Sequence, residues 1–135
     1  EASTPEEGRR TILLVEDNPK VRATMAAALV QAGYRVFEAS AGDEAVGLFR
    51  EHPDVDLLLT DIVMPGDIQG TDLAKALRER SPDLAIVFVS GYASDETVRG
   101  AGLRADDIRL MKPVRRADLL RAVANALADR RPSGV

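Results

Sequence analysis

The sequence predicts an α/β fold in which helices cover both faces of a parallel sheet. Along the 135 residues, five short apolar runs alternate with five segments of helical pattern. Strict alternation of this kind is typical of βα units, and the length fits one domain. Several of the runs are apolar at nearly every position, which is typical of strands that are buried on both faces. These observations favour a five-stranded sheet built from five βα units.

The first unit begins with the apolar run 11–16, which predicts a strand. Pro19 suits the first turn of the helix that follows, with Asp17 or Asn18 as its cap. One apolar face of this helix repeats at intervals of four residues: Val21, Met25 and Leu29. Gly33 is expected to end the helix, since glycine is common just past a helix end.

The next two units repeat this arrangement. Residues 34–39 alternate between apolar and polar, which predicts a half-buried strand, and residues 42–51 carry an apolar helical stripe. The largely apolar run 55–60 predicts a strand covered on both faces, and residues 71–80 predict the helix after it. Each helix has large apolar residues three or four positions apart, so one face of each is expected to pack on the sheet.

The last two units are shorter. Residues 84–89 predict an apolar strand, and residues 94–101 predict a weak, short helix. Residues 108–112 predict the fifth strand, and residues 115–129 predict the last helix. The flavodoxin-like strand order 2-1-3-4-5 is the leading topology. Its ligand crevice lies at the carboxyl ends of strands 1 and 3, where the strand order reverses.

The two ends of the chain differ from the segment between them. Residues 1–10 are polar and acidic and are expected to be a disordered lead-in or tag, and residues 131–135 are expected to be a frayed tail. This leaves residues 11–130 as the folded domain. Because the sequence begins at Glu1 rather than Met, we interpret it as a processed or excised piece of a longer protein.

The composition excludes several classes of protein. The chain is 45% hydrophobic and 30% charged with a formal net charge of −4, and no stripe of basic residues with interleaved aromatics suggests nucleic-acid binding. It has no cysteine and one histidine, His52, which excludes disulfides, thiolate metal sites and multi-histidine metal sites. No apolar stretch approaches the ~20 residues of a membrane span and no signal peptide is visible, so we expect a cytoplasmic protein without membrane contact.

Polar residues stand at the ends of four predicted strands. Glu16 and Asp17 follow the first strand, Asp61 the third, Ser90 the fourth and Lys112 the fifth. Because parallel strands end at the same edge of a sheet, we expect these side chains to converge on one crevice. Each residue alone has a simpler explanation as a helix cap, a turn residue or a solvated lysine. Their placement at four strand ends favours a common site.

The three carboxylates predict a site for a divalent cation. At ~4 Å and an effective dielectric constant of about 20, two like charges repel by about 4 kcal/mol, so such a cluster binds a cation or takes up protons. With oxygen ligands only, Mg²⁺ is the natural ion, and we expect Asp17 and Asp61 to bind it directly and Glu16 to act through water. Directly after a buried strand, Asp61 is also well placed as a nucleophile toward phosphorus.

Ser90 and Lys112 suit the other half of that chemistry. A hydroxyl at the end of the fourth strand can donate a hydrogen bond to a phosphoryl oxygen. A lysine at the crevice can neutralise charge on a transferring phosphoryl group. Pro113, directly after the lysine, requires an abrupt turn and allows a cis peptide bond there.

Residues 11–130 resemble a receiver domain of two-component response regulators. The resemblance rests on four motifs: Glu16-Asp17, Asp61-Ile62-Val63-Met64-Pro65, Ser90-Gly91 and Lys112-Pro113. It implies that Asp61 accepts a phosphoryl group from a phosphohistidine on a histidine kinase or histidine phosphotransfer domain. It also implies that Asp17, Asp61 and the backbone carbonyl of Val63 hold Mg²⁺. By the same resemblance, Ser90 and Lys112 hold the phosphoryl oxygens.

The resemblance further implies a switch that catalyses its own phosphorylation and dephosphorylation. Its output surface, through which a homodimer is also expected, comprises residues 94–101, 108–112 and 115–129. Two features depart from the common pattern. Arg109 stands where family members commonly carry the aromatic residue of the switch. The loop 66–70 looks one residue longer than in simple receivers and resembles receivers attached to hybrid histidine kinases.

Two other functions stay open on the sequence alone. One is an Mg²⁺-dependent phosphohydrolase with Asp61 as its nucleophile. Such enzymes usually need a second acidic residue two positions further on, where this chain has Val63. The other is an interaction module that works without phosphorylation, although every residue that the phosphoacceptor function needs is present.

Overall fold

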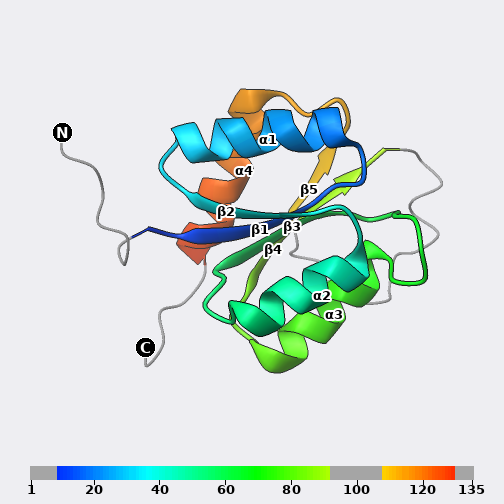
Figure 1. Cartoon of the computed structure of the whole chain (residues 1–135). Helices are drawn as coiled ribbons and strands as arrows, with labels where there is room; N and C mark the ends of the chain where they lie inside the picture. Colours follow the sequence, from blue (N-terminus) through cyan, green and yellow to red (C-terminus); the bar gives the residue numbers. More distant parts are fainter. Residues whose placement is uncertain (1–8, 92–107, 130–135) are drawn as a thin grey trace.

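The computed structural model describes residues 9–91 and 108–129, which form a five-stranded sheet between helices (Figure 1). In chain order the elements are β1 (Thr11–Val15), α1 (Pro19–Gln31), β2 (Arg35–Ala39), α2 (Gly42–Glu51), β3 (Leu57–Asp61), α3 (Gly70–Arg80), β4 (Ala85–Ser90), β5 (Ile108–Met111) and α4 (Arg116–Asp129). The strand order is β2-β1-β3-β4-β5, and every neighbouring pair is parallel. The predicted fold class and strand order are therefore confirmed.

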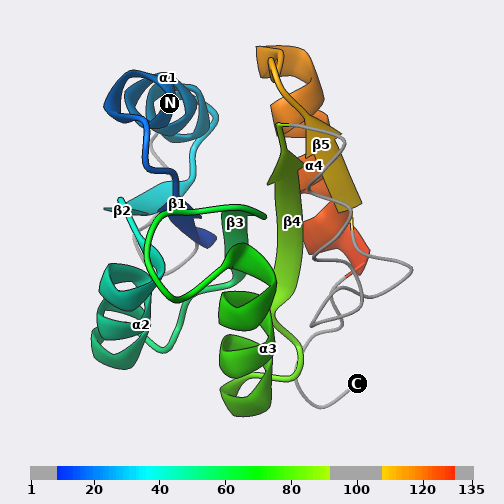
Figure 2. The same cartoon turned by 90° about the vertical axis from the view of Figure 1, so that its right-hand side faces the viewer.

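The helices lie in two layers, with α1 and α4 on one face of the sheet and α2 and α3 on the other (Figure 1, Figure 2). The helix predicted at 94–101 lies outside the described residues. Within the described ranges, no helix is long and apolar enough to cross a membrane.

Successive residues of the central strands contribute to two hydrophobic layers. In β1, Ile12 and Leu14 pack on the side of α1 and α4, whereas Leu13 and Val15 pack on the side of α2 and α3. Side chains of a strand point alternately to its two faces, so a sheet covered on both faces needs apolar residues at every position. This is why the run at 57–59 also lacks a polar–apolar alternation.

Helix α1 begins at a side-chain cap directly after β1. Oδ1 of Asn18 accepts hydrogen bonds from the backbone N–H groups of Lys20 (2.9 Å) and Val21 (3.1 Å). Of the two predicted caps, Asn18 is the correct one. The helix ends near Gly33 as expected, and the φ of +102° at this residue is one that favours glycine.

Replacing Asn18 with alanine is expected to lower the free energy of unfolding by about 1 kcal/mol, because two N–H groups of the first turn lose their acceptor. Asn18→Ser keeps a capping oxygen and should stay close to the parent protein. Urea unfolding followed by circular dichroism measures both variants. Equal stabilities of the parent and Asn18→Ala would contradict the capping role.

Candidate functional site

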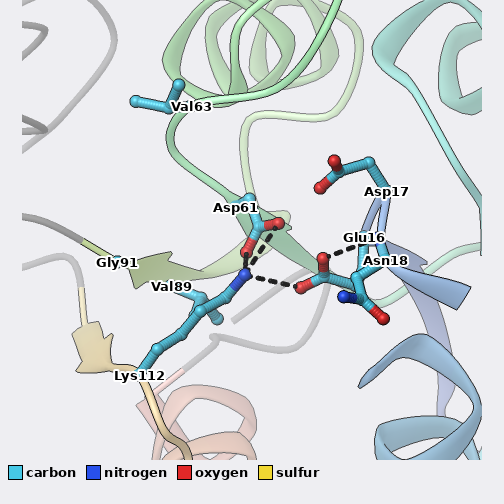
Figure 3. Close-up of a pocket in the computed structure, with 8 residues that line it drawn as sticks. All are labelled: Glu16, Asp17, Asn18, Asp61, Val63, Val89, Gly91 and Lys112. Carbon is cyan, nitrogen blue, oxygen red and sulfur yellow. Dashed lines mark hydrogen bonds and ion pairs between the residues drawn. The ribbon is translucent and has the colours of Figure 1, made fainter. Parts of the chain in front are cut away.

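Polar residues from several strands meet at the carboxyl edge of the sheet (Figure 3). Glu16 and Asp17 follow β1, Asp61 is the last residue of β3, and Lys112 follows β5. Together with four neighbours these residues line one pocket; the neighbours are Asn18, Val63, Val89 and Gly91. The pocket lies beside β1 and β3, where the strand order reverses, which is the expected position of a ligand crevice in such a sheet.

Three carboxylates lie together in this pocket. Oxygens of Glu16, Asp17 and Asp61 lie within 4.8 Å of one another. Glu16 is 1% exposed and Asp61 is 4% exposed, whereas Asp17 is open to solvent. Among the described residues, the ammonium group of Lys112 is the only cation that pairs with the buried Oε1 of Glu16 and Oδ1 of Asp61. Because one ammonium group cannot balance three carboxylates, this set of oxygen donors fits a divalent cation that prefers oxygen ligands.

The ammonium group of Lys112 reaches the carboxylates from the end of β5 (Figure 3). Its Nζ lies 3.1 Å from Oε1 of Glu16 and 3.4 Å from each carboxylate oxygen of Asp61. One ammonium beside three carboxylates leaves excess negative charge when all are ionised, so the pocket still attracts a cation. The peptide bond between Lys112 and Pro113 is cis, one of the alternatives that the sequence allowed.

Asp61 binds a proton more tightly than an ordinary aspartate does. Burial raises its pKa, and the neighbouring Glu16 raises it further through its charge and a shared hydrogen bond. Lys112 opposes these effects only in part, and the resulting pKa of Asp61 is about 8. Without a cation, the carboxyl group of Asp61 therefore holds a proton at neutral pH, and cation binding must release it.

Glu16 and Lys112 remain charged beside Asp61. Burial raises the pKa of Glu16, but hydrogen bonds from the backbone of Asn18 and from Asp61, together with Lys112, hold it below its ordinary value. Burial likewise lowers the pKa of Lys112, but Asp61 and Glu16 outweigh burial and leave it raised. The pocket thus contains an ion pair next to an aspartate whose proton can be displaced.

The other two predicted site residues differ in how they meet the pocket. Val63 lies in the loop after β3, is half exposed, and lines the pocket with its side chain directed away from the carboxylates (Figure 3). Ser90 ends β4 and is buried, and its neighbours Val89 and Gly91 line the pocket in its place. The carbonyl of Ser90 accepts a hydrogen bond from the N–H of Lys112 (2.9 Å). The roles expected of the Ser90 hydroxyl and the Val63 carbonyl stay predictions.

Arg22 of α1 holds the loop that carries Glu16 and Asp17. Its guanidinium group donates a hydrogen bond to the backbone carbonyl of Glu16 (2.8 Å), and its Nε pairs with Glu38 of β2 (3.4 Å). The sequence analysis did not identify Arg22. A separation of six residues carries no signal of this contact, which depends on how α1 turns back over the sheet.

Gly70, the first residue of α3, packs directly on the end of β3. Its N–H donates to the carbonyl of Ile62 (2.8 Å). A Cβ atom at Gly70 would collide with the carbonyl oxygen of Asp61 and would lie 2.8 Å from the carbonyl carbon of the same residue. This close approach of α3 to β3 therefore requires glycine. Gly70 was predicted to lie in the loop, so this contact was not predicted, although a glycine at a helix start was a usable signal.

A doubly wound parallel sheet with carboxylates after β1 and β3 and a lysine after β5 defines the class of receiver domains in two-component signalling. The chain belongs to this family, because residues 12–124 match the family model described as response regulator receiver domain. The resemblance inferred from the sequence motifs is thereby confirmed.

Two relatives from Brucella abortus (strain 2308) illustrate the settings of this domain. The chain is 40% identical over 114 residues to the sensor kinase CckA, and the match covers 84% of this chain but 12% of CckA. It is 36% identical over 118 residues to the response regulator receiver protein CpdR, and this match covers 87% of the chain and 97% of CpdR. The chain thus spans a small part of one relative and nearly all of the other.

Solved structures support the same fold. The structure of a response regulator receiver protein from Sinorhizobium medicae WSM419 matches with a TM-score of 0.83 and 30% sequence identity. The match covers 93% of this chain and 100% of that chain. The sheet and its helical layers therefore follow the receiver fold over nearly the whole length of that structure.

Proposed function

We propose that this receiver domain is a phosphoacceptor, in which Asp61 takes a phosphoryl group from a phosphohistidine in an Mg²⁺-dependent reaction and thereby switches a signalling surface. The observation that carries the proposal is the cluster of Glu16, Asp17 and Asp61, whose oxygens lie within 4.8 Å of one another, with Lys112 3.4 Å from Asp61. Membership of the response regulator receiver family supports it.

Asp17, Asp61 and the backbone carbonyl of Val63 would hold Mg²⁺, with Glu16 acting through a water molecule. The donors fit this ion because they are all oxygens, and because three carboxylates share the single ammonium group of Lys112. When bound, Mg²⁺ supplies positive charge that stabilises the transferring phosphoryl group. Asp61 must lose its proton to react, since its pKa is about 8 without the ion.

In the transfer, a carboxylate oxygen of Asp61 forms a bond to phosphorus while the bond from phosphorus to the histidine nitrogen breaks. The products are an aspartyl phosphate and a histidine that takes up a proton. The ammonium group of Lys112 can pair with the phosphoryl oxygens as negative charge moves toward Asp61. Ser90 is buried and is not among the residues that line the pocket, so we propose that the end of β4 moves to bring its hydroxyl to a phosphoryl oxygen. This movement is the proposed first step of the switch.

The proposed phosphoryl donor is a histidine kinase or a histidine phosphotransfer domain. The proposed output surface comprises β5 and α4 together with residues 94–101, which lie outside the described residues. Within the described sheet β5 is an edge strand, and Met111 at its end is 57% exposed, so this surface can contact a second copy of the chain or another protein. Arg109 is half-buried in β5, in register with Phe88 of β4.

Incubation with acetyl phosphate and Mg²⁺ is expected to add one phosphoryl group to the parent protein and none to Asp61→Asn, because the amide is a far weaker nucleophile than the carboxylate. Intact mass spectrometry measures the adduct. Asp67→Asn is a matched control, since Asp67 is an exposed aspartate in the loop that follows β3. This variant should be phosphorylated like the parent, and EDTA should prevent the reaction in both.

The same experiment separates the two other functions. Steady release of inorganic phosphate over many turnovers would indicate a phosphohydrolase. Absence of both a phosphate adduct and a beryllofluoride complex in the parent would indicate an interaction module that works without phosphorylation. An adduct of equal yield on Asp61→Asn would show that the phosphoacceptor is another residue.

A further inference from the structure

We propose that Gln69 is a positioning residue of the metal site, which acts by holding the loop segment that carries Val63. This inference rests on the proposed function, because the carbonyl of Val63 is a ligand only if Mg²⁺ binds at this pocket. Gln69 does not line the pocket and would not touch the ion. Its effect would pass through the loop between β3 and α3.

The side-chain amide of Gln69 binds both backbone groups of Met64, the residue next to Val63. Its Oε1 accepts a hydrogen bond from the N–H of Met64 (2.9 Å), and its Nε2 donates to the carbonyl of Met64 (2.9 Å). A third hydrogen bond runs from Nε2 to the carbonyl of Gly66 (3.3 Å). The amide therefore pairs with the loop much as a neighbouring strand would, and it fixes the path of the backbone next to Val63.

These three hydrogen bonds, which form the Gln69 clamp, are the main polar support of residues 63–66. Within the described residues, no backbone hydrogen bond other than those to Gln69 involves residues 63–66. The side chain of Met64 is buried, but Val63 and Gly66 are exposed. Loops that expose their backbone and bury few apolar groups open at little cost in free energy. Removal of the amide should therefore loosen the segment that carries the proposed ligand.

Gln69 is itself anchored to α3. It is the N-cap residue of this helix, and its backbone N–H donates to the carboxylate of Asp72 (3.1 Å). The side chain thus connects the loop to a packed helix whose first residue, Gly70, contacts the backbone of Asp61. The carboxylate ligand on β3 and the carbonyl ligand on the loop are in this way held relative to the same helix.

The clamp needs a primary amide. Only Gln and Asn carry a carboxamide, in which an acceptor oxygen and a donor nitrogen stand on the same carbon and can pair with the N–H and C=O of one residue. Asn is one methylene shorter and would not span the same distance from the helix start. Gln69→Met keeps the length and the neutral charge of the side chain and removes all three hydrogen bonds, so it is the matched variant.

The test measures Mg²⁺ affinity by calorimetry and amide hydrogen exchange in EDTA for the parent and Gln69→Met. Groups that orient metal ligands from outside typically matter by a factor of 10 or more, so we expect Gln69→Met to bind Mg²⁺ about tenfold more weakly. The N–H of Met64 should also exchange faster in this variant without metal. Leu127→Ala, a cavity variant in the buried face of α4, should be less stable but should bind Mg²⁺ like the parent.

Three outcomes would overturn the inference. If the parent binds Mg²⁺ and Gln69→Met binds it equally well, Gln69 has no positioning role, while the proposed function stands. If Leu127→Ala loses affinity to the same extent, the loss reflects general stability rather than the clamp. If the parent binds no Mg²⁺ at all, the proposed metal site fails and the role of Gln69 fails with it.

Discussion

Replacing Gly70 with alanine is expected to lower the free energy of unfolding by about 3 kcal/mol and to weaken Mg²⁺ binding. The new Cβ would collide with the carbonyl oxygen of Asp61 and lie 2.9 Å from Cα of Ile62. Both partners are backbone atoms of a central strand end, so relief requires moving α3 or the end of β3. Alanine favours the helix over glycine by about 1 kcal/mol, which is smaller than the cost of the clash.

Denaturant unfolding and Mg²⁺ titration measure the two effects of this change. Gly47→Ala is the matched control, since Gly47 lies inside α2 and a Cβ there meets nothing within 4 Å. With no clash, this variant should be more stable than the parent by about 0.5–1 kcal/mol. A lower free energy of unfolding in Gly70→Ala together with a higher one in Gly47→Ala would support the role of Gly70 as the contact between α3 and β3. A Gly70→Ala variant as stable as Gly47→Ala would rule it out.

The fold was largely predictable because its strands are covered on both faces. The run 57–59 must be apolar at every position, whereas the turn residues and caps between such runs are polar. The order of apolar and polar residues along the chain therefore shows where each βα unit begins and ends. The site residues Asp17, Asp61 and Lys112 were predictable for a related reason. A parallel sheet gathers the carboxyl ends of its strands at one edge, so a residue's place at a strand end predicts that it lies at that edge.

The contacts that support the site could not be predicted in the same way. Arg22 reaches the carbonyl of Glu16, and Gln69 reaches the backbone of Met64, only through the path that the loops take in three dimensions. No periodicity or strand end marks either residue. Ser90 shows the converse: its position at the end of β4 was predicted correctly, but it is buried and is not among the residues that line the pocket. Topology assigns residues to an edge, and local packing decides which atoms reach the crevice.

Without divalent cations, Asp61→Asn is expected to be more stable than the parent at about pH 9 by roughly 5 kcal/mol. Burial and the nearby carboxylate of Glu16 raise the pKa of Asp61 to about 8 in the folded protein. In the unfolded chain the carboxyl group ionises near its ordinary pKa of about 4. The parent should therefore lose stability as the pH rises from about 4 through 8, since only the unfolded state readily releases the proton. Asparagine removes this penalty.

The pH window separates Asp61 from its two neighbours. The lowered pKa of Glu16 contributes stability that is lost only as the pH falls into the acidic range, and the raised pKa of Lys112 contributes stability that is lost only at strongly alkaline pH. Both groups remain in Asp61→Asn. The difference in stability between variant and parent should therefore grow between about pH 4 and 8 and then level off.

Urea unfolding in EDTA across this pH range, followed by circular dichroism, measures the difference. Asp67→Asn, which changes an exposed aspartate of the neighbouring loop, should follow the parent at every pH. Addition of Mg²⁺ should stabilise the parent and leave Asp61→Asn nearly unchanged, because binding to the folded state alone raises its stability. A stability difference that does not vary with pH would mean that the Asp61 carboxyl group ionises as readily in the folded protein as in the unfolded chain. Burial of the ionised Asp61 without a cation would then not lower the stability of the folded protein.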